Sequence, residues 1–103
     1  MRMIEIEPGV LEFVRGEAGK LGIKKPVVLI MDCGCMMNEG SVELDIKEEG
    51  PHEGYELYTE IEGIKFYIKP KVRKSAEGGR IGVKTYGAGR FKRLEFYPAS
   101  CPR

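Results

Sequence analysis

The chain has no tryptophan, no glutamine, a single histidine and no long apolar run among its 103 residues. Its longest apolar run, "VVLIM", is far shorter than the roughly 18 residues that a membrane-spanning helix needs. The N-terminal "MRMIEIEPG" also lacks the continuous apolar segment of a signal peptide. We therefore expect a cytoplasmic protein with no membrane partner.

The scarcity of histidine and serine argues against an enzyme. The one histidine, His52, stands in the turn-rich stretch "EGPHEGYE", where a solvated loop residue is the simplest interpretation. The chain contains no serine nucleophile elbow and no paired metal-ligand histidines. The glycine-rich "GGRIGVKTYGAG" lacks the Lys-Ser/Thr ending of a phosphate-binding loop. We expect a protein that is not an enzyme.

Cysteine is also scarce, and the three present are too few for a disulfide-stapled scaffold. In a reducing compartment they would be thiols, available to a metal or to redox chemistry. The shortage of glutamine and asparagine beside abundant Glu and Lys is typical of thermophilic proteins.

Length and hydrophobic patterning predict a single domain over residues 1–103. The segment 8–21 carries an apolar stripe at helical spacing, Pro8 suits the first helical turn, and Gly22 is placed to end the helix. The stripe consists of Val10, Leu11, Phe13, Val14, Ala18 and Leu21. This segment is the one long helix that the sequence predicts.

Strand patterns follow this helix. The apolar run 27–33 predicts a strand buried on both faces, and 41–48 alternates Val42, Leu44 and Ile46 with charged residues. Residues 55–70 contain two strands that turn at Gly63, and 71–79 is a short helical turn or a basic loop. Two last strands cover 80–87 and 90–98, and in the latter the apolar residues keep no clean alternation. The predicted class is α+β, one N-terminal helix followed by six or seven mostly antiparallel strands.

Two cysteines stand one residue apart at the end of the first predicted strand, in "MDCGCMM". Residues at i and i+2 of a strand point to the same face, and Gly34 allows a bend that would bring both sulfurs to one centre. Two thiolates leave a tetrahedral metal short of ligands, so Cys101 is the natural third. Thiolates favour iron–sulfur clusters, Zn or Cu(I). Cys33, Cys35 and Cys101 are therefore the candidate metal ligands.

Three other interpretations of this stretch stay open. Met31, Met36 and Met37 beside two thiolates would suit Cu(I), although methionine also fills irregular gaps in a core. A thiol–disulfide redox role for the Cys-x-Cys pair is also open, although its disulfide would close a very small, strained ring. The cysteines could also be small buried side chains without any chemistry.

The order of elements resembles the HesB-like family of A-type iron–sulfur cluster carriers. The helix 8–21 leads to a strand that reaches the first cysteine position in "VVLIMDCGC", "YTEIEGIKFYIKP" is similar to a later strand of the family, and "GAGRFKRLEFYP" is similar to its penultimate segment. The family ends in Cys-Gly-Cys, whereas "PASCPR" offers one cysteine and the Cys-x-Cys lies in the first turn. The chain therefore resembles a divergent member of this family, in which the C-terminal Cys-Gly-Cys is absent.

This resemblance implies a HesB-like mixed β fold and a carrier or scaffold for iron or an iron–sulfur cluster, bound through the three cysteines. It also implies cluster donor or acceptor proteins as partners. A homodimer is expected, because three thiolates per chain underfill one four-cysteine cluster. The alternative is a fold relative that has lost the site.

Charge is distributed very unevenly along the chain. Residues 1–63 hold 14 acids and 6 bases, whereas residues 64–103 hold 2 acids and 11 bases. One interpretation is a fold whose acidic and basic parts complement each other. The other is a module that binds nucleic acid or an acidic partner, with aromatic residues (Tyr67, Tyr86, Phe91, Phe96, Tyr97) between the bases. Its candidate residues are Lys69, Lys71, Arg73, Lys74, Arg80, Arg90, Lys92 and Arg93.

Overall fold

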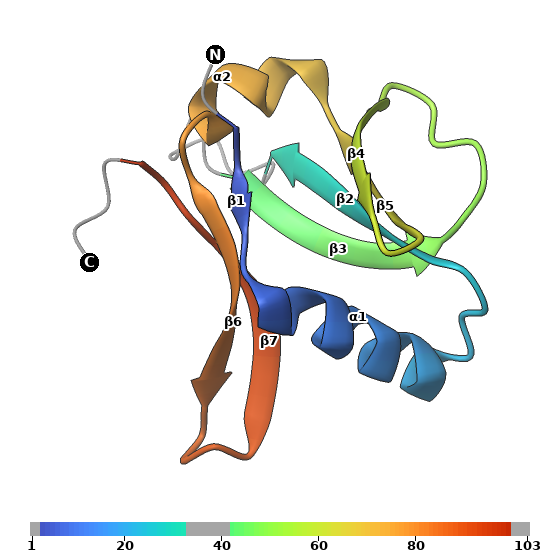
Figure 1. The fold of residues 1–103 in the computed structure, drawn as a ribbon, viewed down its shortest axis with the longest axis vertical. Coiled ribbons are helices and arrows are strands. Elements are labelled where there is room, and N and C mark those ends of the chain that lie inside the picture. The colour runs from blue at the N-terminus through green and yellow to red at the C-terminus, as the bar shows by residue number, and fades with distance from the viewer. Residues whose placement is uncertain (1–2, 33–41, 100–103) are drawn as a thin grey trace.

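The computed structural model describes residues 3–32 and 42–99. It confirms the α+β class: two helices and seven strands in two mixed sheets lie within these ranges (Figure 1). One sheet has the strand order β1-β6-β7 and the other has the order β3-β2-β5-β4. Three of the five strand pairings are antiparallel, and the pairs β1–β6 and β2–β5 are parallel.

Helix α1 (Pro8–Leu21) has the predicted bounds. Pro8 needs no N–H partner in the first turn, and Gly22 ends the helix in the left-handed conformation with φ of 72°. Its buried residues are Val10, Leu11, Val14 and Ala18. Gly22 and Ile23 donate backbone hydrogen bonds to the last turn, which satisfies carbonyls that would otherwise lack a partner.

The four-stranded sheet has the two most apolar strands of the chain, β2 and β5, at its centre. Strand β2 (Pro26–Asp32) is buried from Val27 to Ile30, as its continuous apolar run predicts, and it lies between β3 (Val42–Glu48) and β5 (Ile64–Ile68). Strand β4 (Glu56–Ile61) joins β5 through a tight turn in which Glu62 and Gly63 have positive φ. The predicted turn at Gly63 is therefore confirmed.

The three-stranded sheet contains a strand that the sequence analysis missed. Strand β1 (Glu5–Ile6) pairs with β6 (Arg80–Tyr86), which in turn pairs with β7 (Phe91–Tyr97). The basic segment between the sheets forms a 3-10 turn, η1 (Pro70–Val72), and a short helix, α2 (Arg73–Ala76). One of the two expectations for this segment, a short helical turn, is thus correct.

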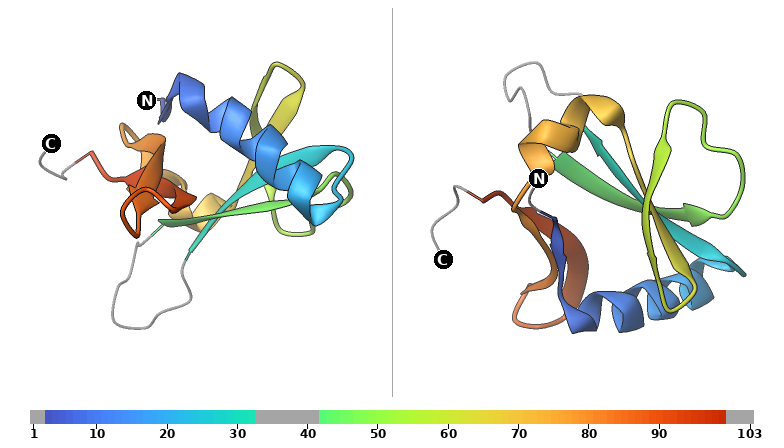
Figure 2. Two further views of the ribbon diagram at one scale, coloured as in Figure 1. Left: turned by 90° about the horizontal axis from the view of Figure 1, so that it is seen from below. Right: turned by 45° about the horizontal axis from the view of Figure 1, so that its top comes forward.

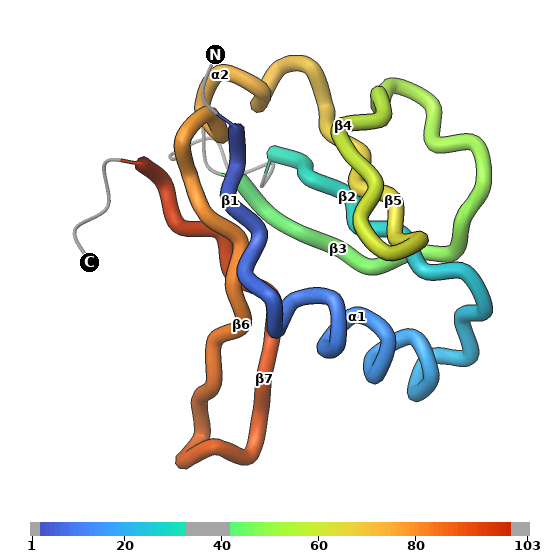
Figure 3. Tube along the Cα trace, viewed as in Figure 1, coloured from blue at the N-terminus to red at the C-terminus, as the bar shows by residue number. Residues whose placement is uncertain are grey.

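A single hydrophobic cluster joins α1 and both sheets. Phe66, Ile68 and Ile81 are fully buried in it, and Leu94 and Phe96 of β7 pack against it. The right view of Figure 2 shows α1 along the bottom, next to both sheets, and the tube in Figure 3 shows the β6–β7 hairpin extending away from the helix. Within residues 3–32 and 42–99, no helix is long and apolar enough to cross a membrane.

Candidate functional site

The three predicted cysteine ligands lie outside the described residues, as do Met36 and Met37. The strands that lead to them are described. Strand β2 ends at Asp32, immediately before Cys33, and β7 ends at Tyr97, four positions before Cys101. In Figures 1 and 2 the end of β2 lies beside the start of β3, whereas the end of β7 lies farther out, toward the C-terminus. The structure thus describes the two strand ends that precede Cys33 and Cys101, and not the cysteines themselves.

Asp32, the last residue of β2, lies between two lysines that follow β5. Its carboxylate oxygens lie 3.0 Å from Nζ of Lys71 and 3.6 Å from Nζ of Lys69. The hydrogen bond from Lys71 and the charges of both lysines hold the pKa of Asp32 below its ordinary value, against the opposing effect of desolvation. Two ammonium groups against one carboxylate leave a surplus of positive charge here. Positive charge favours a thiolate over a thiol at a cysteine nearby.

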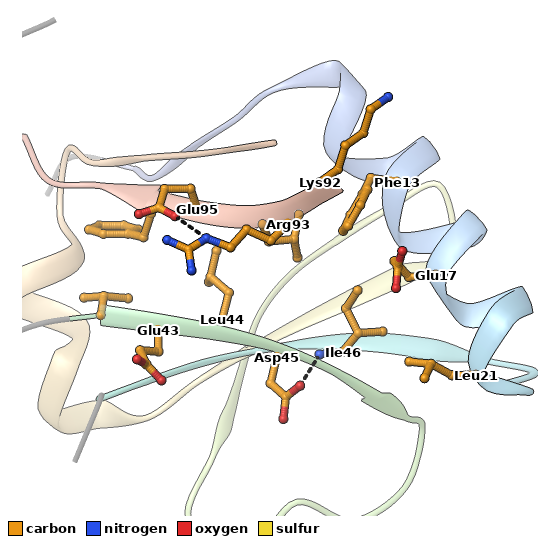
Figure 4. Close-up of a pocket in the computed structure, with 13 residues that line it drawn as sticks. Phe13, Glu17, Leu21, Glu43, Leu44, Asp45, Ile46, Lys92, Arg93 and Glu95 are labelled. Carbon is orange, nitrogen blue, oxygen red and sulfur yellow. Dashed lines mark hydrogen bonds and ion pairs between the residues drawn. The ribbon is translucent and has the colours of Figure 1, made fainter. Parts of the chain in front are cut away.

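A groove of about 440 Å³ runs between α1 and the edge strands of the two sheets, β3 and β7 (Figure 4). Val42 at the start of β3 and Phe96 near the end of β7 both line it. Two of its charged side chains have local partners: Arg93 donates to Glu95 at 3.1 Å, and the Asp45 carboxylate accepts the Ile46 N–H at 2.9 Å. The described residues contain no group of three or more acidic, histidine or cysteine side chains that could hold a metal.

His52 lies in the loop between β3 and β4, as predicted, but it is half-buried and not fully solvated. Its Nε2 is 3.1 Å from the Glu48 carbonyl oxygen, and its ring centroid is 5.6 Å from that of Tyr67. These contacts are enough to account for its position in the fold. Met31 is half-buried at the end of β2.

Four of the eight predicted basic residues neutralise acids of the first half of the chain. Lys69 and Lys71 pair with Asp32 as described above. Arg73 Nη1 lies 2.9 Å from Glu56 Oε1, and Arg80 pairs with Glu7. This arrangement supports the interpretation that the acidic and basic halves complement each other within the fold.

The other four predicted basic residues lie in α2 or in the β6–β7 hairpin. Arg93 pairs with Glu95, only two positions away. Lys74, Arg90 and Lys92 form no ion pair with any residue in the described ranges. Lys84, which the sequence analysis did not select, lies directly opposite Arg93 in the hairpin. Alternation along each strand places Lys84 with Tyr86 and Phe91 with Arg93. The pairing register then puts all four on one face, and this register cannot be predicted from the sequence.

Comparisons with protein families, with curated proteins and with solved structures each returned no match for this chain.

Proposed function

We propose that the chain is a carrier or scaffold that takes iron or an iron–sulfur cluster as cargo through Cys33, Cys35 and Cys101. The sequence has three thiols, and thiolates are the common protein ligands of iron–sulfur clusters. The observation that carries the proposal is the pair of thiols that directly follows the end of β2, with one residue between them. The surplus positive charge at Asp32 supports it, because thiolates are the binding form.

The proposal includes the resemblance to the HesB-like carriers, as a divergent member, and a location in the cytoplasm. Free thiols in an odd number suit a reducing compartment. We also propose that two chains share one cluster, since three thiolates do not complete a four-ligand set. Donor and acceptor proteins for the cluster are the partners that a carrier requires.

The test is anaerobic purification, metal analysis and a UV–visible spectrum before and after iron and sulfide are supplied. We expect sulfur-to-iron charge-transfer absorption with stoichiometric iron in the wild type, and its loss in Cys33→Ala, Cys35→Ala and Cys101→Ala. Ser41→Ala and Ser100→Ala serve as matched controls, because each changes a residue near a cysteine without removing a thiol. Light scattering should show a dimer that forms with the cluster.

Other outcomes would change or overturn the proposal. Zinc or copper bound by the same three thiols would keep the site and replace the metal, and a further loss in Met36→Leu and Met37→Leu would identify Cu(I). A colourless, metal-free protein that none of the three cysteine substitutions alters would exclude the carrier. The chain would then be better described as one that has no metal function at these cysteines.

A further inference from the structure

The β6–β7 hairpin has two different faces, which its pairing register defines. Ile81 pairs with Phe96 and Val83 with Leu94, and these residues belong to or pack against the core. Lys84 pairs with Arg93 and Tyr86 with Phe91 on the opposite face. We call the four side chains Lys84, Tyr86, Phe91 and Arg93 the hairpin tip surface. All four are exposed to solvent.

The two aromatic side chains of this surface have large exposed fractions. Tyr86 is 47% exposed and Phe91 is 55% exposed, although the two rings stack on each other with centroids 5.5 Å apart and an interplanar angle of 25°. Aromatic rings on strands are more often core residues. Here the core is already supplied by Leu94 and Phe96, so the exposed pair has no packing role in it.

The turn holds Phe91 in place. Gly87 has φ of 61°, and a Cβ atom at this position would lie 2.7 Å from Cδ2 of Phe91. Only glycine leaves room for the ring to lie against the turn in this backbone conformation. The Tyr86 and Phe91 rings stack on each other in this arrangement, and a site formed in advance reduces the entropy cost of binding.

Two cations lie next to the aromatic pair on the same face of the hairpin. Of the four basic residues in 84–93, these are Lys84 and Arg93, whereas Lys92 pairs with Thr85 on the other face. Lys84 and Arg93 face each other directly, an arrangement that destabilises a hairpin. The Arg93 guanidinium lies 5.7 Å from the centroid of the Tyr86 ring and remains 58% exposed in spite of its contact with Glu95. Two cations beside exposed rings form a surface that suits an anionic ligand with flat, apolar groups.

We propose that the hairpin tip surface binds single-stranded nucleic acid, with bases stacked on Tyr86 and Phe91 and phosphates bound by Lys84 and Arg93. Bases stack on aromatic rings. Lys84 and Arg93 are each two positions from a ring along their strands, so they can bind the phosphates of the same nucleic acid. A duplex buries its base faces and cannot use the rings in this way. An acidic peptide would use the cations but would leave the aromatic pair without a partner.

The experiment is a fluorescence anisotropy titration of the full chain with labelled oligonucleotides of about 12 nucleotides, within the range of single-strand site sizes. Oligo-dT, oligo-rU and a duplex of the same length are compared over a series of salt concentrations, and poly-glutamate is used as competitor. We expect the two single strands to bind more tightly than the duplex. The difference between oligo-dT and oligo-rU then distinguishes DNA from RNA as the preferred ligand.

Two variants separate stacking from charge. Phe91→Leu keeps an apolar side chain and should weaken binding roughly tenfold with an unchanged salt dependence, because stacking is lost. Lys84→Gln should lower the slope of log K against log salt by about 0.7, the value for one phosphate contact on a single strand. Lys24→Gln is the matched charge control, on the loop after α1, and should bind like the wild type. Circular dichroism confirms that each variant folds.

Three results would overturn the proposal. The first is the absence of oligonucleotide binding at low salt in the folded protein. The second is binding that Phe91→Leu leaves unchanged, since stacking would then play no part. The third is full displacement by poly-glutamate together with equal affinity for duplex and single strand, which would identify a general acidic partner.

Discussion

At the scale of single residues, close packing explains which glycines the chain needs. A Cβ atom at Gly79 would overlap the Phe96 ring and lie 2.9 Å from the Tyr97 carbonyl oxygen. The Gly79 carbonyl also accepts the Glu5 N–H, where β1 joins the sheet. In contrast, nothing lies within 4 Å of a Cβ atom at Gly19 in α1. The first glycine allows a close contact between strands, and the second only weakens a helix.

These two glycines should therefore respond to alanine in opposite directions. Gly79→Ala should lower the free energy of unfolding by about 1–3 kcal/mol, because β7 must shift to accept the methyl group. Gly19→Ala should raise it by up to about 1 kcal/mol, the helix-propensity difference between the two residues. Urea unfolding followed by circular dichroism measures both. Equal changes of the same sign would contradict the packing described for Gly79.

At the scale of elements, the β6–β7 hairpin contains a charge pair that favours the proposed binding but lowers the free energy of unfolding. The opposition of Lys84 and Arg93 costs stability whatever the hairpin binds. Lys84→Thr should therefore raise the free energy of unfolding by roughly 0.2–0.5 kcal/mol, since it removes the repulsion and adds a β-branched side chain. The gain should be largest at low salt, where exposed charges are least screened.

Lys47→Thr provides the comparison on another strand. Lys47 in β3 lies 3.4 Å from the Asp45 carboxylate, so its replacement removes an attractive contact and not a repulsive one. Thermal unfolding at two salt concentrations compares the variants. A stability gain in Lys47→Thr as large as that in Lys84→Thr would show that β-propensity alone explains the result.

The elements also show where sequence reasoning succeeded. The bounds of α1, the buried strand β2 and the turn at Gly63 follow from local patterns, namely helical spacing, an apolar run and a turn glycine. Strand β1 was missed because two residues are too few for a reliable pattern, although Ile4 and Ile6 alternate with Glu5 and Glu7. The irregular alternation of β7 is resolved by its two faces, since Phe91 points away from the core that Leu94 and Phe96 join.

The candidate site was less accessible to sequence reasoning. The charge of a basic residue is visible in the sequence, but its partner is not. Lys71 and Arg80 pair with Asp32 and Glu7, which lie far away along the chain, and only the fold brings them together. The importance of Lys84 depends on the pairing register in the same way. The cysteine hypothesis depends on side-chain chemistry, and its ligands lie outside the described residues.

At the scale of the whole molecule, one core connects α1 with both sheets. Ile68 of β5 and Ile81 of β6 are both fully buried in the same cluster. We therefore expect a single cooperative unfolding transition. Ile68→Val should destabilise the protein by about 0.5–1.5 kcal/mol, because it removes one buried methylene group. The transition should shift equally by far-UV circular dichroism and by tyrosine fluorescence.

The tyrosines make this comparison informative, since Tyr58 and Tyr67 belong to one sheet and Tyr86 and Tyr97 to the other. Two separate transitions, of which Ile68→Val moves only one, would show that the sheets unfold independently. A coincident shift in the two signals would show that the shared core makes them one unit.

The parallel pairing of β1 with β6 has a consequence for synthesis in the cell. Glu5 leaves the ribosome before its partner Arg80, which follows about 75 positions later. Until Arg80 emerges, Ile4 and Ile6 have no sheet to join, and their apolar side chains stay accessible to chaperones and to other nascent chains. Contacts this distant along the chain also slow folding. The three-stranded sheet can therefore form only after β6 and β7 have been made.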